Sequence, residues 1–153
     1  MARSYSINGS ATTNASATLP LLTVISTAAV RTKIYDVVVG SDATPADNAA
    51  KFQFQRCSSA GTAGSSITPQ AIDPGDPAAV TTSGLAVFSV GPTLTASAFL
   101  LQFAVNQRAT FRWVAAPGKE MVCPATASNG IALMNPVVGG SNYNAVMSLE
   151  VEE

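Results

Sequence analysis

The stretch FAVNQRATFRWVAAPGKE, residues 103–120, alternates apolar and polar side chains on both sides of a short polar reversal. An alternation with a period of two places the apolar residues on one face of a β-strand. The pattern predicts a hairpin with strands at 99–105 and 109–116, joined by a tight turn. Pro117 and Gly118 occupy the second and third positions of the next reversal, which is the preference of a type II turn.

The faces of this predicted hairpin separate its aromatic residues from its charge. Phe103, Phe111 and Trp113 share one face, and Arg112 lies on the other. Aromatic side chains of this size bury large apolar areas, so we expect the three rings to fill a core. A core sheet is favoured over the alternative, a ligand platform built on the same rings. We expect Arg112 to contribute little to folding.

The same periodicity recurs along the chain and predicts its fold class. The further strand candidates are 18–27, 30–40, 51–57, 79–90, 98–106, 129–134 and 143–153. Turn-forming residues separate these segments, and no long capped helical window occurs. The sequence therefore predicts an all-β protein, an antiparallel β-sandwich with about eight strands and a jelly-roll-like arrangement.

The first residues form a separate feature in this prediction. Residues 1–18 are small and polar and lack a strong apolar pattern, so we expect an extended N-terminal arm followed by one β-sandwich domain over 19–153. Such an arm is either frayed or ordered only against a neighbouring molecule.

The composition restricts the classes of partner. Hydrophobic residues make up 47% of the chain and charged residues only 11%, with 8 basic and 9 acidic residues and a formal net charge of −1. Nucleic-acid binders carry a basic stripe that is absent here, so no nucleic acid is expected. No apolar run is long enough for a membrane helix, so a soluble protein made in a cytoplasm is predicted. A nearly neutral surface favours association with other protein.

The sequence also lacks the groups that most enzymes use. It contains no histidine, which removes the usual general base and the commonest metal ligand. We expect no catalytic residue, no cofactor and no metal site. Asp73 and Asp76 flank a Pro-Gly turn, where bonding to their own backbone is favoured over calcium binding. Cys57 and Cys123 are expected to be reduced thiols.

A carbohydrate-binding or adhesin-type sandwich is the alternative to a purely structural protein. Sugar sites need exposed aromatic rings with amide or carboxylate groups nearby. The candidates are Tyr5, Tyr35, Asn142 and Tyr143, which do not form one cluster in the sequence.

Two long segments resemble a known family. They are KIYDVVVGSDATPADNAAKFQFQRCSSAGTAGSSITPQAIDPGDPAA at 33–79 and LLQFAVNQRATFRWVAAPGKEMVCPATASNGIAL at 100–133. Both resemble small virion proteins of tailed bacteriophages, the capsid decoration or cement proteins, across roughly half of the chain. These segments are scaffold sequences and not a catalytic signature.

The resemblance implies a fold, a place and partners. Members of this family have a jelly-roll-like β-sandwich and bind the outer surface of the capsid as homotrimers, where they clamp subunits of the major capsid protein. A chain of this kind would be made in the host cytoplasm and would end as a structural component of the virion.

Overall fold

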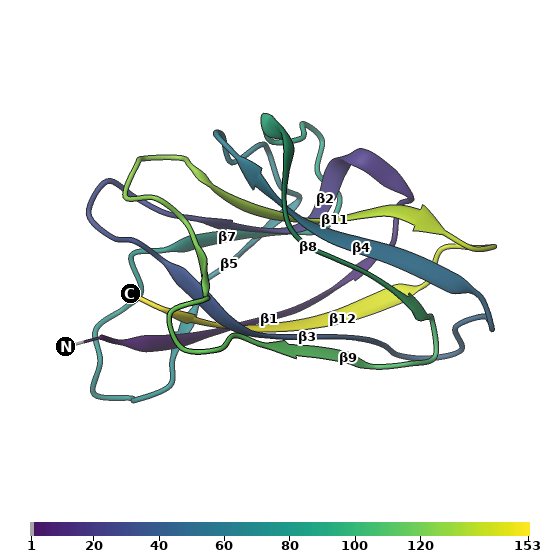
Figure 1. The fold of residues 1–153 in the computed structure, drawn as a ribbon, viewed down its shortest axis with the longest axis horizontal. Coiled ribbons are helices and arrows are strands. Elements are labelled where there is room, and N and C mark those ends of the chain that lie inside the picture. Colours follow the sequence, from purple (N-terminus) through teal and green to yellow (C-terminus); the bar gives the residue numbers. More distant parts are fainter. Residues whose placement is uncertain (1) are drawn as a thin grey trace.

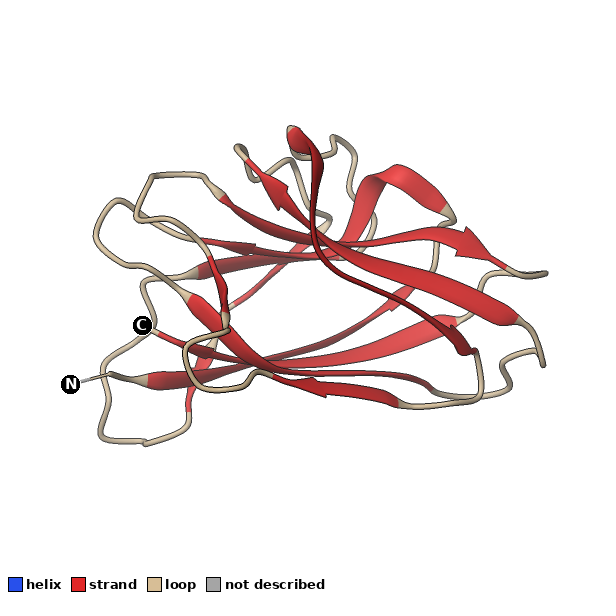
Figure 2. Cartoon of the chain, in the orientation of Figure 1, coloured by secondary structure: helices blue, strands red, loops and turns tan. Residues whose placement is uncertain are grey.

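The computed structural model describes residues 2–153, and all of its regular secondary structure is β-strand (Figure 2). The strands are β1 (Ser4–Thr12), β2 (Ser16–Ile25), β3 (Lys33–Ser41), β4 (Ala49–Cys57), β5 (Ser65–Ile67), β6 (Gln70–Ala71), β7 (Thr82–Leu85), β8 (Leu94–Asn106), β9 (Phe111–Val114), β10 (Met121–Val122), β11 (Gly130–Val138) and β12 (Asn144–Glu152).

These strands form two sheets that pack face to face (Figure 1). Sheet A has the order β10-β3-β12-β1-β6, with β9 also paired to β3, and sheet B has the order β5-β7-β2-β11-β4-β8. Every ladder is antiparallel. The prediction of an all-β antiparallel sandwich is confirmed.

The number of strands differs from the prediction, and the reason is their length. The structure has twelve strands where about eight were expected. Four strands were not expected: one is β1, and the other three, β5, β6 and β10, are only two or three residues long. An alternation cannot be recognised over so few residues. The jelly-roll connectivity stays a prediction.

The N-terminal segment is part of the sandwich, and the expectation of an extended arm over residues 1–18 is wrong for the described part. Strand β1 lies between β12 and β6 in sheet A and pairs with β12 along its whole length, from Ser4 opposite Glu152 to Thr12 opposite Asn144. The side chains of Tyr5 and Ile7 are fully buried. The polar alternate residues that suggested an arm form the solvent side of an inner strand.

The core lies between the two sheets and follows the predicted alternation most closely in β12. Tyr143 and the inward residues of that strand are buried, while its other residues are at least partly exposed: the buried set is Tyr143, Ala145, Met147, Leu149 and Val151. Large apolar side chains from sheet B face them, with Phe52, Phe54 and Leu133 no more than 1% exposed. Burial of this apolar area is the main force that holds the sheets together.

The segment from 99 to 116 does not form the predicted hairpin. Strand β8 pairs with β4 in sheet B, whereas β9 pairs with β3 in sheet A, so the turn between them carries the chain from one sheet to the other. Phe103 and Phe111 face each other across this gap, with ring centroids 3.7 Å apart, and Phe103 also stacks on Phe52 at 5.4 Å. The predicted core face is correct for these rings, but the strands that carry them belong to different sheets.

Both faces of sheet B are covered. On the outer face a second apolar cluster contains Ile25, Cys57, Ala132 and Met134, packed against Leu94 at the start of β8. This cover explains why two glutamines expected on a wet face are buried.

The two glutamines, Gln53 and Gln55, are each only 6% exposed. They are bonded to β8: Gln102 donates to the Oε1 of Gln53 at 3.2 Å, and Gln55 donates to the Thr95 carbonyl at 2.9 Å. Buried amides of this kind are tolerated because they keep hydrogen-bond partners.

The chain ends lie together at one end of the sandwich (Figure 1). Arg3 and Glu153 exchange two backbone hydrogen bonds, at 3.2 and 2.9 Å. The opposite end is formed by residues 41–48, 106–110 and 139–143, and we call it the loop end. No helix that could span a bilayer occurs within residues 2–153.

Candidate functional site

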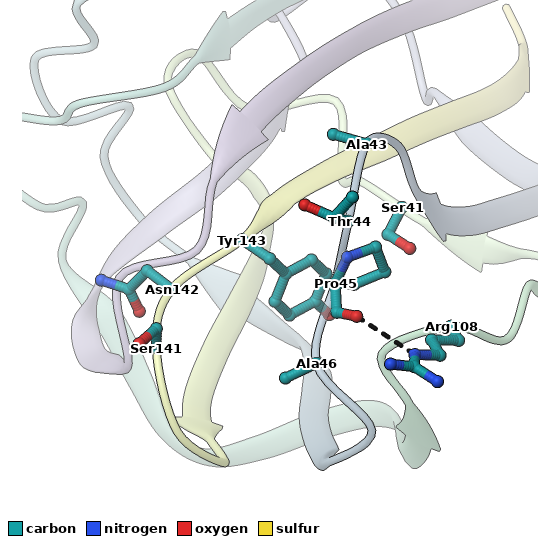
Figure 3. A pocket seen from close by; sticks show the side chains of 9 residues that line it. All are labelled: Ser41, Ala43, Thr44, Pro45, Ala46, Arg108, Ser141, Asn142 and Tyr143. Carbon is teal, nitrogen blue, oxygen red and sulfur yellow. Dashed lines mark hydrogen bonds between the residues drawn. The ribbon is translucent and has the colours of Figure 1, made fainter.

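The loop end contains a pocket with a volume of about 660 Å³ (Figure 3). Three connections build it: the segment after β3, the turn between β8 and β9, and the segment before β12. The lining residues are Ser41, Ala43, Thr44, Pro45, Ala46, Arg108, Ser141, Asn142 and Tyr143. Pockets of this size accommodate small molecules.

Hydrogen bonds between the connections hold this pocket in shape. Ser41 donates through its hydroxyl to the Gln107 carbonyl at 2.5 Å, and the Nε of Arg108 donates to the Pro45 carbonyl at 3.1 Å (Figure 3). The backbone amide of Arg108 donates to the side chain of Asn106 at 2.9 Å, which forms the turn locally. The pocket is therefore a product of contacts between segments more than sixty residues apart.

Tyr143 forms the deepest aromatic part of the pocket. Its side chain is only 9% exposed, and its backbone amide donates to the hydroxyl of Thr13 at 2.9 Å. In Figure 3 the ring extends from the start of β12 toward Pro45 and Arg108. No residue within 2–153 hydrogen bonds to its hydroxyl. Burial raises the pKa of Tyr143 to about 12, so the hydroxyl keeps its proton and can donate.

Arg108 is the single charged residue among those that line the pocket. Two carboxylates lie on neighbouring segments, and each accepts a hydrogen bond from an amide. Asn144 donates to Asp42 at 2.9 Å, and Asn106 donates to Asp47 at 2.5 Å. These bonds orient both acids beside the pocket, and neither acid is part of its lining.

The structure brings together only two of the four sugar-binding candidates. Asn142 and Tyr143 both line the pocket. Tyr5 lies in the core, where its hydroxyl donates to the Pro77 carbonyl at 3.2 Å. Tyr35 lies on β3, next to Ser4 and Glu150, and takes no part in the pocket.

Sequence reasoning did not single out Arg108 or Ser41 for this site. The Asn-Gln-Arg run of residues 106–108 indicates a turn and gives no sign of what the turn faces. Only the crossing from sheet B to sheet A places Arg108 beside the segment after β3.

A second candidate surface for binding another protein is the outer side of β8, which we call the free edge. Strand β8 is the last strand of sheet B, and no strand within residues 2–153 pairs with its outer side. Its thirteen residues, LTASAFLLQFAVN, contain neither a charge nor a proline. Phe99 on this strand is 45% exposed, because an irregularity in the register separates it from the inward-facing Leu101.

Arg112 has a partner that the sequence did not reveal. Its guanidinium donates to both carboxylate oxygens of Asp36, with the Nε at 3.1 Å from Oδ1. Asp36 is 8% exposed, and its hydrogen bonds with Arg112 lower its pKa below the ordinary value. The pair lies on the outer face of sheet A and fastens β9 to β3.

The remaining polar candidates have local roles. Asp73 accepts a hydrogen bond from the Gly75 amide at 2.8 Å, as expected for this turn, and Asp76 lies 3.8 Å from Arg3. Cys57 and Cys123 are free and buried, and burial raises their pKa values to about 11 and about 12. Within residues 2–153 no three residues of the types His, Cys, Asp and Glu are grouped so as to hold a metal ion.

No known protein family matches this sequence, and comparisons with curated proteins and with solved structures found no match either.

Proposed function

We propose that this protein is a capsid decoration protein of a tailed bacteriophage, a homotrimer that binds the outer surface of the capsid and stabilises contacts between major capsid protein subunits. The resemblance of residues 33–79 and 100–133 to that family motivates the proposal. The structural observation that supports it most is the long uncharged free edge of β8 on a rigid sandwich.

An edge of this kind is unusual in a protein that stays alone. Natural sheets protect their edges with charges, prolines, bulges or covering segments. Strand β8 has a bend at Ser97, where φ is +56°, but its straight part from Leu100 to Asn106 has no charge and no proline. Contact with another protein would satisfy the unpaired backbone groups of this part, as in β-strand addition.

The charge-poor surface fits the same role. Burying an unpaired charge in an interface is costly, while small neutral side chains lose little on leaving water. A trimer repeats each weak contact with the capsid three times and so raises the overall affinity. Binding to the assembled shell and not to free subunits would stabilise the shell by mass action.

The capsid role is tested with purified shells that lack this chain. We expect the protein to cosediment with the shells at a fixed ratio to the major capsid protein and to raise the temperature at which they release DNA. Absence of the chain from purified virions, or failure to bind shells, would reject the proposal.

The trimer and its location are tested separately. Light scattering should give a trimer mass for the protein, and Phe99→Lys on the free edge should abolish it. Val146→Lys is the matched control, because Val146 is 40% exposed on the outer face of sheet A. If Val146→Lys dissociates the trimer and Phe99→Lys does not, the interface is sheet A and not the free edge.

A carbohydrate-binding or adhesin-type module is a second candidate function. The observation that favours it is the pocket at the loop end, where Asn142 and Tyr143 meet Arg108. Its first test is binding to a glycan array.

A further inference from the structure

The pocket at the loop end presents hydrogen-bond donors that the protein itself does not use. The Nε of Arg108 is bonded to the Pro45 carbonyl, which fixes the side chain, while its two terminal nitrogens have no hydrogen-bond partner within residues 2–153. The hydroxyl of Tyr143 has none either. A guanidinium held in this way offers a planar pair of N–H groups to an incoming ligand.

The hydroxyl of Tyr143 is the second of these donors. Most of this side chain is buried, but its hydroxyl is not among the buried polar atoms that lack a partner, so the oxygen reaches the solvent of the pocket. Its backbone is tied to Thr13, and its ring extends toward Pro45 and Arg108 (Figure 3). The hydroxyl therefore opens on the pocket, where water or a ligand can bond it.

The lining limits what that occupant is. The pocket contains one positive charge and no acid, so it favours an anionic group over a cationic one. Around that charge are the hydroxyls of Thr44 and Ser141 and the amide of Asn142, which suit a ligand with several hydroxyls. The ring of Pro45 supplies apolar surface for the C–H face of a sugar, whereas the Tyr143 ring, only 9% exposed, offers little beyond its hydroxyl.

We propose that this pocket binds a sugar ring that carries a carboxylate, such as a uronic or a sialic acid. The terminal nitrogens of Arg108 bind the carboxylate as a bidentate pair, and the Tyr143 hydroxyl bonds a ring substituent. Asp42 and Asp47 lie beside the pocket and reduce its attraction for an anion. Salt weakens this repulsion only in part, because Asp42 is the sequence neighbour of two lining residues.

This inference rests on the second candidate function and gives its ligand class, and it is independent of the capsid role. A virion protein of either kind could present the loop end to the outside. The experiment below therefore separates the failure of the ligand class from the failure of sugar binding altogether.

The test is a titration of the full-length protein at pH 7 and 150 mM salt, followed by calorimetry and by NMR. The acidic probes are trigalacturonic acid and sialyllactose, and the neutral probes are galactotriose and lactose. We expect at least one acidic probe to bind at least about tenfold more tightly than its neutral counterpart, a difference of about 1.4 kcal/mol. Its NMR shifts should fall on the lining residues of the pocket.

Two variants with matched controls locate the binding. Arg108→Gln should remove the preference for the acidic probe, and Tyr143→Phe should weaken its binding several-fold while the unfolding midpoint stays close to that of the parent. The controls are Arg31→Gln, at an exposed arginine outside the pocket, and Tyr35→Phe, and neither should change binding.

Each other outcome overturns the inference. Equal binding of acidic and neutral probes in the pocket would leave sugar binding in place and refute the carboxylate. Binding that both pocket variants leave unchanged would place the sugar elsewhere. If no probe binds, both the carboxylate-sugar inference and the second candidate function are refuted.

Discussion

Phe99 and Phe103 lie four residues apart on β8, and simple alternation assigns both to the core face. The structure separates them: Phe103 stacks between Phe52 and Phe111, whereas Phe99 is 45% exposed beyond an irregularity in the ladder between β4 and β8. Replacing each by alanine therefore tests the register of the strand that carries the free edge.

We expect Phe103→Ala to lower the free energy of unfolding by about 3 kcal/mol. A fully buried Phe→Ala change costs about 3–5 kcal/mol, and Phe103 is only partly buried, which points to the lower end. Its two ring contacts, worth about 0.5–1.5 kcal/mol each, are part of this loss. Phe99 is more exposed, so Phe99→Ala loses less buried area and leaves no enclosed cavity, and we expect a loss of about 1 kcal/mol.

Urea unfolding followed by the fluorescence of Trp113 measures both values, because this is the only tryptophan in the chain. The measurement is repeated at several protein concentrations, since assembly would raise the apparent stability. The difference of about 2 kcal/mol between the two variants corresponds to about 4–8 °C in the midpoint of thermal unfolding for a domain of this size. A loss for Phe99→Ala equal to that for Phe103→Ala would refute the assigned register.

Three further predictions follow from contacts elsewhere in the fold. Because Arg112 lowers the pKa of Asp36, this pair stabilises the fold above the ordinary carboxyl value of 3.8, and the stabilisation is lost as the pH falls through the lower pKa of the folded state. Arg112→Ala should therefore lower the urea midpoint at pH 7 and lower it much less at pH 2. Equal decreases at both pH values would contradict the ion pair. Cys57 and Cys123, with pKa values of about 11 and about 12, should not react with a thiol reagent at pH 8 until the protein unfolds. Rapid reaction in the native protein would show that the outer cluster of sheet B is open at Cys57, or that the main core is open at Cys123. Gly118 has φ +77° and no atom within 4 Å of an added methyl group, so Gly118→Ala should cost about 1–2 kcal/mol through backbone strain alone. In Gly130→Ala the new methyl group would lie 2.1 Å from the Val24 carbonyl oxygen and should prevent stable folding. Similar melting temperatures for the two variants would argue against the close approach of β2 and β11.

The sequence predicts correctly those strands whose own pattern of apolar and polar residues matches the burial of their side chains. In β12 the residues alternate between apolar and polar except at the exposed Val146, and one face of the strand is buried while the other is at least partly exposed. Local pattern and final burial then agree, as they also do at the turn of Pro117 and Gly118, where Gly118 has φ +77° and Lys119 bonds back to Ala116.

Prediction failed where a distant segment changes the environment of a strand. Gln53 and Gln55 have the polarity of a wet face, but β8 covers them and supplies their hydrogen bonds. The polar residues of β1 suggested a separate arm, because a pattern of Ser, Asn and Thr has no apolar signal strong enough to reveal an inner strand of a sheet. In both cases the missing information is the strand partner.

The candidate site was less predictable than the fold for the same reason. Tyr143 and Asn142 were candidates as an aromatic ring and an amide, yet nothing near them in the sequence indicates Arg108. That residue reaches the pocket because β8 and β9 belong to different sheets, whereas a hairpin, as predicted, would have kept its turn within one sheet.

The free edge ends at Asn106, two residues before Arg108, but the two residues that test the contact surfaces, Phe99 and Arg108, are far apart along the chain. Phe99 and Arg108 are nine residues apart, and a strand rises about 3.3 Å per residue, so the exposed ring on the free edge lies well away from the pocket. A charge placed at position 99 therefore acts on assembly without reaching the sugar site, and a neutral side chain at position 108 acts on the sugar site without disturbing the uncharged edge. Between these two positions the stacked rings of Phe52, Phe103 and Phe111 join the two sheets. Assembly and ligand binding can thus be lost one at a time, which is what makes the two functional proposals separately refutable.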